Sequence, residues 1–204
     1  MTAAVEAAAD RSDVRTILTG GAILGVLTAV GVTAFALLSR ALAGAVEVIV
    51  QAGLIVLGGV VVSYLPASRI RPRSVDGIAW AAMIGLLGAL GFTVLDTAIL
   101  RPLQLYHWTW DAIGGGSGFW YIPVWWMGSA VLAWLGAWVV AMAARGGREA
   151  HPVAVGAQSA GVGVLLFAAA AGTRLLPFHA TTAALAFAVG LGLHVLIAAV
   201  AYRK

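Results

Sequence analysis

The chain is almost continuously apolar from Ile17 to Tyr202, and only short polar loops interrupt this character. Of its 204 residues, 62% are hydrophobic and 10% are charged, whereas charged residues make up about a quarter of a water-soluble domain. A chain of this composition has too few polar side chains to cover its own surface in water. The sequence therefore indicates a protein that lies in a lipid bilayer.

The apolar stretches predict the architecture. A bilayer core is about 30 Å thick, so a spanning helix needs about 20 apolar residues, and helices satisfy their own backbone hydrogen bonds in lipid. Six stretches have this length, namely residues 17–38, 43–64, 77–100, 120–144, 153–173 and 181–202. We therefore predict an all-α, polytopic integral membrane protein, with residues 1–204 forming one domain built as a bundle of six transmembrane helices.

The basic residues predict the orientation, because Lys and Arg are retained on the cytoplasmic side of a membrane. Nine of them fall on one side of the predicted bundle: Arg11, Arg15, Arg69, Arg71, Arg73, Arg145, Arg148, Arg203 and Lys204. Only Arg40, Arg101 and Arg174 fall on the other side. Both termini are therefore expected in the cytoplasm, with residues 1–16 as a cytoplasmic segment.

Charge and composition exclude several classes of function. The net charge of +4 is spread over separate loops, which fits topology and contact with anionic lipid heads rather than binding of nucleic acid. The chain has no Cys, which excludes disulfides and thiolate chemistry. No metal-binding spacing or cofactor motif is apparent. The abundance of Arg, Ala and Gly favours a bacterial protein, and thus a multi-pass protein of the bacterial inner membrane.

Small residues recur at helical spacing in three of the predicted helices. Because lipid tails are as apolar as Leu, helices in a bilayer associate through close packing of small side chains. The rows are Gly21 and Gly25; Gly77, Ala81, Gly85 and Ala89; and Ala133, Ala137 and Ala141. We expect these rows to face neighbouring helices, either within the chain or in a protein partner.

Three ionisable residues fall within the predicted spans, namely Glu47, Asp96 and His194. Such residues cost about 2.5–3.5 kcal/mol on insertion scales, so they mark either a site or a paired group. Glu47 and Asp96 are candidate catalytic groups, or else interfacial carboxylates that are hydrated or paired with Arg. His194 is expected to form a hydrogen bond across a helix pair or, alternatively, to bind a ligand.

The segment 101–128 holds five of the eight Trp residues, at positions 108, 110, 120, 125 and 126. Trp and Tyr anchor helices at the membrane interface, but large, stiff aromatic side chains also form walls for flat apolar ligands. The segment is thus either an aromatic belt or a lid over a ligand. The candidate ligand-binding residues are Trp108, Trp110, Asp111, Trp120, Tyr121, Pro123 and Trp125.

Part of this region resembles a known family. The pairs Leu95-Asp96 and Ile122-Pro123, with Trp108-Thr109-Trp110 and Gly118 between them, resemble a pattern in membrane-bound carotenoid-biosynthesis proteins, the bacterioruberin-type hydratases and small lycopene cyclases. The resemblance implies that Asp96 is the catalytic carboxylate and that Trp108, Trp110 and Pro123 line a polyene pocket. Glu47 would then correspond to an earlier Glu of the hydratases.

Three functions follow from these features. The first is binding or modification of an apolar ligand of the isoprenoid or carotenoid type at a Trp-rich site near the outer face of the membrane. The second is a non-enzymatic, structural or accessory subunit of a larger membrane complex. The third is a small transporter, although inverted repeats and broken helices, which are typical of transporters, are not apparent in the sequence.

Overall fold

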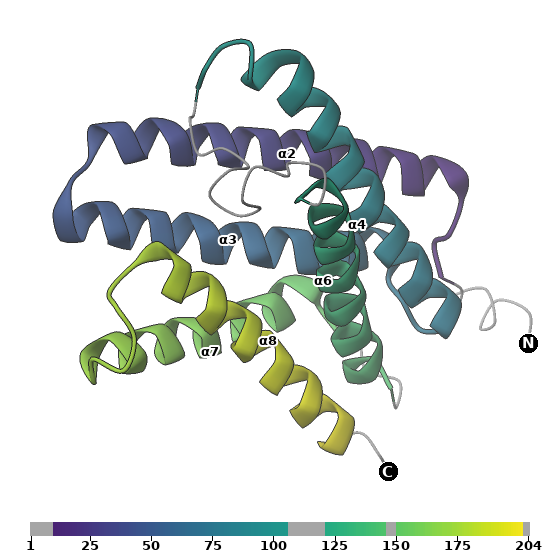
Figure 1. The fold of residues 1–204 in the computed structure, drawn as a ribbon. Helices are drawn as coiled ribbons and strands as arrows, with labels where there is room; N and C mark the ends of the chain where they lie inside the picture. Colours follow the sequence, from purple (N-terminus) through teal and green to yellow (C-terminus); the bar gives the residue numbers. More distant parts are fainter. Residues whose placement is uncertain (1–9, 106–120, 146–149, 202–204) are drawn as a thin grey trace, which may run out of the picture.

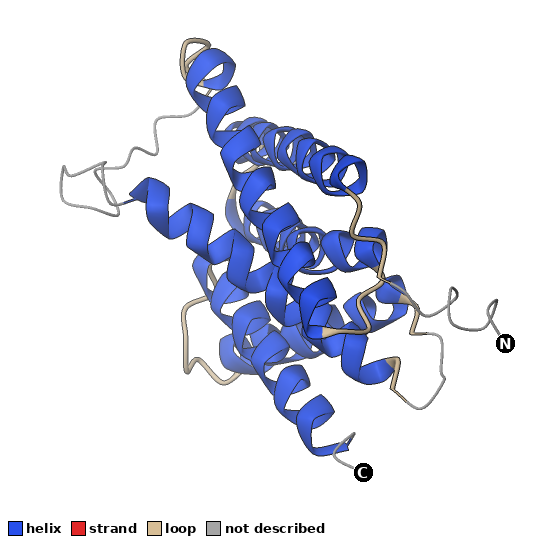
Figure 2. Ribbon diagram, turned by 90° about the vertical axis from the view of Figure 1, so that its right-hand side faces the viewer, coloured by secondary structure: helices blue, strands red, loops and turns tan. Residues whose placement is uncertain are grey.

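The computed structural model describes residues 10–105, 121–145 and 150–201, and within these ranges it is all-α (Figure 1, Figure 2). Six long helices and one short π-helical segment follow one another along the chain. Their bounds are α2 (Val14–Ala41), α3 (Gly44–Ile70), α4 (Val75–Leu95), η1 (Asp96–Leu100), α6 (Tyr121–Ala143), α7 (Pro152–Gly172) and α8 (Ala180–Ala201). Each of the six long helices is long and apolar enough to span a membrane, α4 together with η1. The predicted fold class is confirmed.

Local hydrogen bonds determine where the helices begin and end, and helices α2 and α3 extend beyond the apolar stretches. Asp13 caps α2 by accepting a hydrogen bond from the Thr16 backbone N–H at 2.9 Å. The Thr16 hydroxyl also donates to Asp13, and these two bonds lower the pKa of the Asp13 carboxyl. Helix α3 continues beyond the predicted end to Ile70, and it ends where Arg71 takes the left-handed conformation at φ 54°. Helices α2 and α3 are thus longer than the predicted apolar stretches, because their polar end residues can lie outside the apolar core of the bilayer.

Helices that follow one another along the chain run in roughly opposite directions, whereas α2 and α4 run in the same sense (Figure 1). Helices α2 and α3 lie side by side, α4 packs against α2, and α6 packs against both α4 and α3. Helices α7 and α8 form a pair that packs against α3. We call the side where α2 begins and α8 ends the terminal side, and the opposite side the loop side.

The small residues lie where helices touch. A Cβ atom placed on Gly25 of α2 would lie 3.0 Å from the Gly88 carbonyl oxygen of α4. On the other face of α4, a Cβ atom on Gly85 would lie 2.7 Å from the Ser129 carbonyl oxygen of α6. The remaining members of the predicted rows that are buried are Gly21, Gly77, Ala81, Ala89, Ala133, Ala137 and Ala141. The rows therefore serve contacts within the chain.

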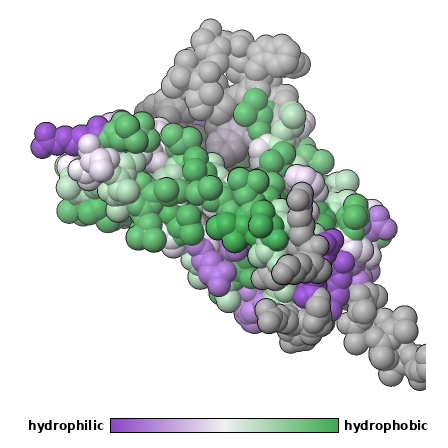
Figure 3. Space-filling view, turned by 90° about the horizontal axis from the view of Figure 1, so that it is seen from below, coloured by the Kyte–Doolittle hydropathy of each residue, from purple (hydrophilic) through white to green (hydrophobic). Residues whose placement is uncertain are grey.

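Large apolar side chains cover much of the outer surface. Figure 3 shows one face on which most of the described residues are hydrophobic. Along α8 the exposed side chains include Leu185, Val189, Leu196, Ile197 and Val200, with exposed fractions between 46% and 73%. Exposed apolar surface of this extent marks a contact with a membrane or a protein, and the six helices that are long and apolar enough to span a bilayer indicate a membrane. The described helices thus contact membrane lipids directly.

We predict that a reporter fused after Lys204 reads as cytoplasmic, because nine of the twelve basic residues belong to the terminal side. The measurement compares a fluorescent reporter, which is active in the cytoplasm, with an alkaline phosphatase reporter, which is active in the periplasm. Phosphatase activity at the C-terminus would contradict the prediction.

Gly136→Ala should destabilise the bundle, because a Cβ atom there would overlap the Ser63 carbonyl oxygen of α3. Overpacking of this kind costs about 1–3 kcal/mol. Gly128→Ala is the matched control in the same helix, since a Cβ atom at Gly128 meets no atom within 4 Å among the described residues. Thermal unfolding in detergent should show a lower midpoint for Gly136→Ala alone; equal midpoints for the two variants would refute this contact.

Candidate functional site

Asp96 lies on the loop side, at the point where α4 changes from α-helical to π-helical geometry. The Arg101 backbone N–H donates to the Asp96 carbonyl oxygen at 2.9 Å, which is the hydrogen bond from residue i+5 that defines the π turn. Single π turns within helices occur frequently at functional sites. Asp96 is only 4% exposed, as expected for a carboxylate that faces the bundle.

The Asp96 carboxylate is paired through only one of its oxygens. Arg101 Nε donates to Asp96 Oδ2 at 2.9 Å. The Arg101 side chain of this ion pair is 38% exposed, so the pair is only partly buried. Asp96 Oδ1 is buried and has no hydrogen-bond partner among the described residues. An unpaired buried acceptor costs about 1–3 kcal/mol, and more when it is charged. Within the described part of the chain, Asp96 Oδ1 is therefore an acceptor without a donor.

A second hydrogen bond connects two segments of the loop side near Asp96. Arg40 Nη2, at the end of α2, donates to the Gln104 carbonyl oxygen at 3.1 Å. Gln104 has φ 50°, a left-handed conformation that terminates the helical turns after η1. This bond joins α2 to the segment that carries Arg101, so two of the three basic residues of the loop side lie close to the Asp96 turn.

Glu47 belongs to a different polar group, between α2 and α3. Gln51 Nε2 donates to Glu47 Oε1 and to Ser39 Oγ, each at 2.9 Å. Glu47 and Gln51 lie one turn apart on the same helix face, as the sequence predicts. No hydrogen bond or ion pair joins Glu47 to Asp96 in the described part of the chain. The acid–base role predicted for Glu47 stays a prediction.

Four of the seven predicted ligand-binding residues fall outside the described residues, namely Trp108, Trp110, Asp111 and Trp120. The backbone of Tyr121 and Pro123 forms the first turn of α6. Trp125 is described, and its side chain is 49% exposed on α6. The lid therefore remains a prediction.

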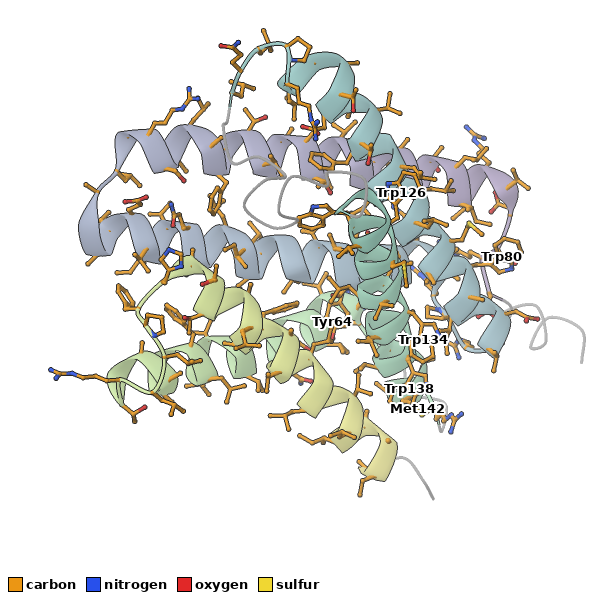
Figure 4. All side chains as sticks on the ribbon, in the orientation of Figure 1. Tyr64, Trp80, Trp126, Trp134, Trp138 and Met142 are labelled. Carbon is orange, nitrogen blue, oxygen red and sulfur yellow. The ribbon has the colours of Figure 1, made fainter. Side chains whose placement is uncertain are left out.

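Trp126 differs from Trp125 because it faces another helix. Its Nε1–H donates to the Thr93 hydroxyl of α4 at 3.1 Å (Figure 4). Thr93 also borders a shallow apolar depression of about 340 Å³, together with Val94, Thr97 and Ala98. The depression and the Trp126 ring thus meet at the turn of α4 that precedes Asp96.

A third polar group, which no pattern in the sequence indicates, lies on the terminal side between α3, α7 and α8. The Tyr64 hydroxyl and Ser159 Oγ are 2.5 Å apart, and Ser159 Oγ is 2.7 Å from His194 Nδ1. Tyr64 and Ser159 are buried, at 3% and 0% exposed, and Figure 4 shows Tyr64 between α3 and α7. We call these three residues the polar triad. The hydrogen bond between Ser159 and His194, across the α7–α8 pair, confirms one of the two sequence expectations for His194.

The proton order within the polar triad follows from counting donors. If the Tyr64 O–H donates to Ser159 Oγ, the Ser159 O–H is available for His194 Nδ1, and every buried donor has an acceptor. In the opposite order the Tyr64 O–H would be buried without an acceptor among the described residues, at a cost of about 1–3 kcal/mol. The first order places the imidazole proton on Nε2.

Comparisons of this chain with protein-family models, with curated proteins and with solved structures give no match. The function is therefore inferred from the geometry of the Asp96 turn and of the polar triad.

Ser159→Ala should destabilise the protein by about 1–3 kcal/mol, because the Tyr64 O–H then loses its acceptor. Tyr64→Phe in the same background should restore most of this stability, since it removes the unpaired donor. A double-mutant cycle from thermal unfolding measures this coupling. Strictly additive effects of the two substitutions would show that the Tyr64–Ser159 hydrogen bond is absent.

Proposed function

We propose that this multi-pass membrane protein binds an apolar molecule of the isoprenoid or carotenoid type on its loop side, between the Asp96 turn and the beginning of α6. In this proposal the membrane is the bacterial inner membrane and the loop side faces outward. The single observation that carries the proposal is the buried Asp96 carboxylate on a π turn, with one oxygen free of partners among the described residues.

A buried acceptor without a donor supports ligand binding, because a ligand that donates a hydrogen bond to it would remove the free-energy cost of leaving it unpaired. A hydroxyl on the ligand, or a water held beside it, would supply the missing donor to Asp96 Oδ1. In its ion pair with Arg101, Asp96 already acts as an acceptor through Oδ2. The geometry therefore supports binding and orientation of a ligand by Asp96 more directly than donation of a proton.

The surface beside Asp96 supports an apolar ligand. The depression formed by Thr93, Val94, Thr97 and Ala98 is open to lipid, so a long hydrocarbon would enter it without leaving the membrane. Thr93, which borders the depression, accepts a hydrogen bond from Trp126, and an indole fixed in this way would provide a flat contact for a polyene. The resemblance of residues 95–123 to carotenoid-biosynthesis proteins points to the same class of ligand.

In the sequence, the small-residue helix faces suggest an accessory subunit, but the structure weakens this hypothesis. Gly25, Gly85 and Gly136 face neighbouring helices of the same chain. Their spacing is therefore explained without a protein partner, and we favour the ligand-binding function.

Asp96→Asn should reduce the polyene content of the purified protein several-fold, because it removes the charge that holds Arg101 in place. The measurement is the absorbance of solvent extracts per mole of protein, after expression in a carotenoid-producing bacterium. Asp76→Asn is the matched control, since Asp76 is exposed in the first turn of the same helix. Absence of polyene from the parent protein, or equal content in the parent and Asp96→Asn, would refute the proposal.

A further inference from the structure

A second pocket adjoins the polar triad on the terminal side, far along the helices from the Asp96 turn. Its volume is about 190 Å³, and it lies between α6, α7 and α8. Its lining residues are Val139, Ala143, Val155, Gln158, His194, Ile197, Ala198 and Ala201. Only two of these carry polar side chains. A mostly apolar pocket with few converging polar groups is typical of sites for small ligands.

The depth of this pocket places it within the membrane. At 1.5 Å per residue, His194 lies about 10 Å from the end of α8, and Ser159 lies about 10 Å from the beginning of α7. Gln158 is exposed, and Ile197 is 62% exposed, so the pocket opens toward the lipid-facing surface. A ligand would therefore arrive from the bilayer and would carry an apolar part.

The two polar groups of the pocket define the head group of the ligand. The proton order of the polar triad leaves the His194 Nε2–H as a donor without a partner among the described residues. The Gln158 amide is likewise unbonded within the described part of the chain, although it lies in a membrane helix where an unpaired amide is costly. A single oxygen acceptor placed between these two side chains would satisfy both.

Charge and volume narrow the class of ligand further. No Arg or Lys is among the described residues that line the pocket, so an anionic head group would have no counter-ion there. A cavity of about 150 Å³ holds one benzene molecule, so this pocket has room for one six-membered ring with its substituents. The ring would lie in the pocket, and an attached hydrocarbon tail would extend into the lipid.

We propose that this pocket binds a neutral six-membered ring that carries a carbonyl oxygen and an isoprenoid tail, with His194 Nε2–H and the Gln158 amide donating to that oxygen. A quinone and a ring-oxidised polyene share this chemistry. The polar triad acts as the support of the site, because Ser159 holds the imidazole by Nδ1 and Tyr64 holds Ser159.

The test is equilibrium binding to the full-length protein in lipid nanodiscs, with empty nanodiscs as the blank. Three probes are compared: a benzoquinone with one isoprene unit, a cyclohexenone ring with a polyene tail, and the same ring and tail without oxygen. We expect saturable binding of at least one of the two carbonyl probes, and the tighter of them identifies the source of the ligand. The oxygen-free probe should bind about tenfold more weakly, as expected for one lost hydrogen bond.

Substitutions in the chain test whether binding of the probes depends on the two polar residues of the pocket. His194→Phe and Gln158→Met should each weaken binding of the carbonyl probe about five- to tenfold. Because Gln158 is exposed, Gln158→Met keeps the test decisive if His194→Phe fails to fold. His179→Ala, at an exposed His in the turn before α8, should leave binding unchanged. Equal binding of all three probes, or unchanged binding in Gln158→Met, would overturn the proposal.

Discussion

The close approach of helix backbones at glycine is the contact on which the rest of this structure depends. Between α7 and α8, a Cβ atom on Gly190 would lie 2.9 Å from the Gly163 backbone nitrogen, so only glycine permits this distance. Gly163 lies one helical turn from Ser159, and Gly190 lies one turn from His194, on the same helix faces. The glycine contact therefore brings the hydroxyl and the imidazole to 2.7 Å of each other. Helices held apart by larger side chains would leave His194 Nδ1 without this partner in the membrane.

Polar groups within the bilayer are stable here because nearly all of them have a partner close by. Hydroxyls on the helices donate to the carbonyl oxygen one turn earlier, as Thr28 and Thr93 do. Tyr64, Ser159 and His194 pair with one another across three helices. Asp96 departs from this pattern, since one of its oxygens is buried without a partner in the described ranges. Ser63 Oγ is likewise buried without a partner in these ranges, so an unpaired group alone does not mark a ligand site. At Asp96 the apolar depression on the same helix is the second observation that supports one.

The six helices and their contact faces could be predicted from the sequence because both depend on local spacing. Apolar runs of about 20 residues determine the spans, and small residues four apart determine the faces, as Gly85 and Ala89 illustrate. The burial of Asp96 also follows from the cost of exposing a carboxylate to lipid. The π turn at Asp96 could not be predicted, since it depends on how α4 continues into Arg101. The polar triad was missed because Tyr64 and Ser159 are 95 residues apart, and only packing of three helices brings them together.

The protonation of His194 tests the central claim most directly, because it depends on the glycine contact and on the polar triad together. Nitrogen-15 spectra of protein labelled at histidine, assigned with His194→Phe, should show His194 with Nε2 protonated and Nδ1 accepting a hydrogen bond. Gly190→Ala should separate α7 from α8 and shift the Nδ1 signal, whereas Gly192→Ala should not, since a Cβ atom at Gly192 meets no described atom within 4 Å. A His194 protonated on Nδ1 in the parent protein, or an unchanged spectrum in Gly190→Ala, would contradict the account.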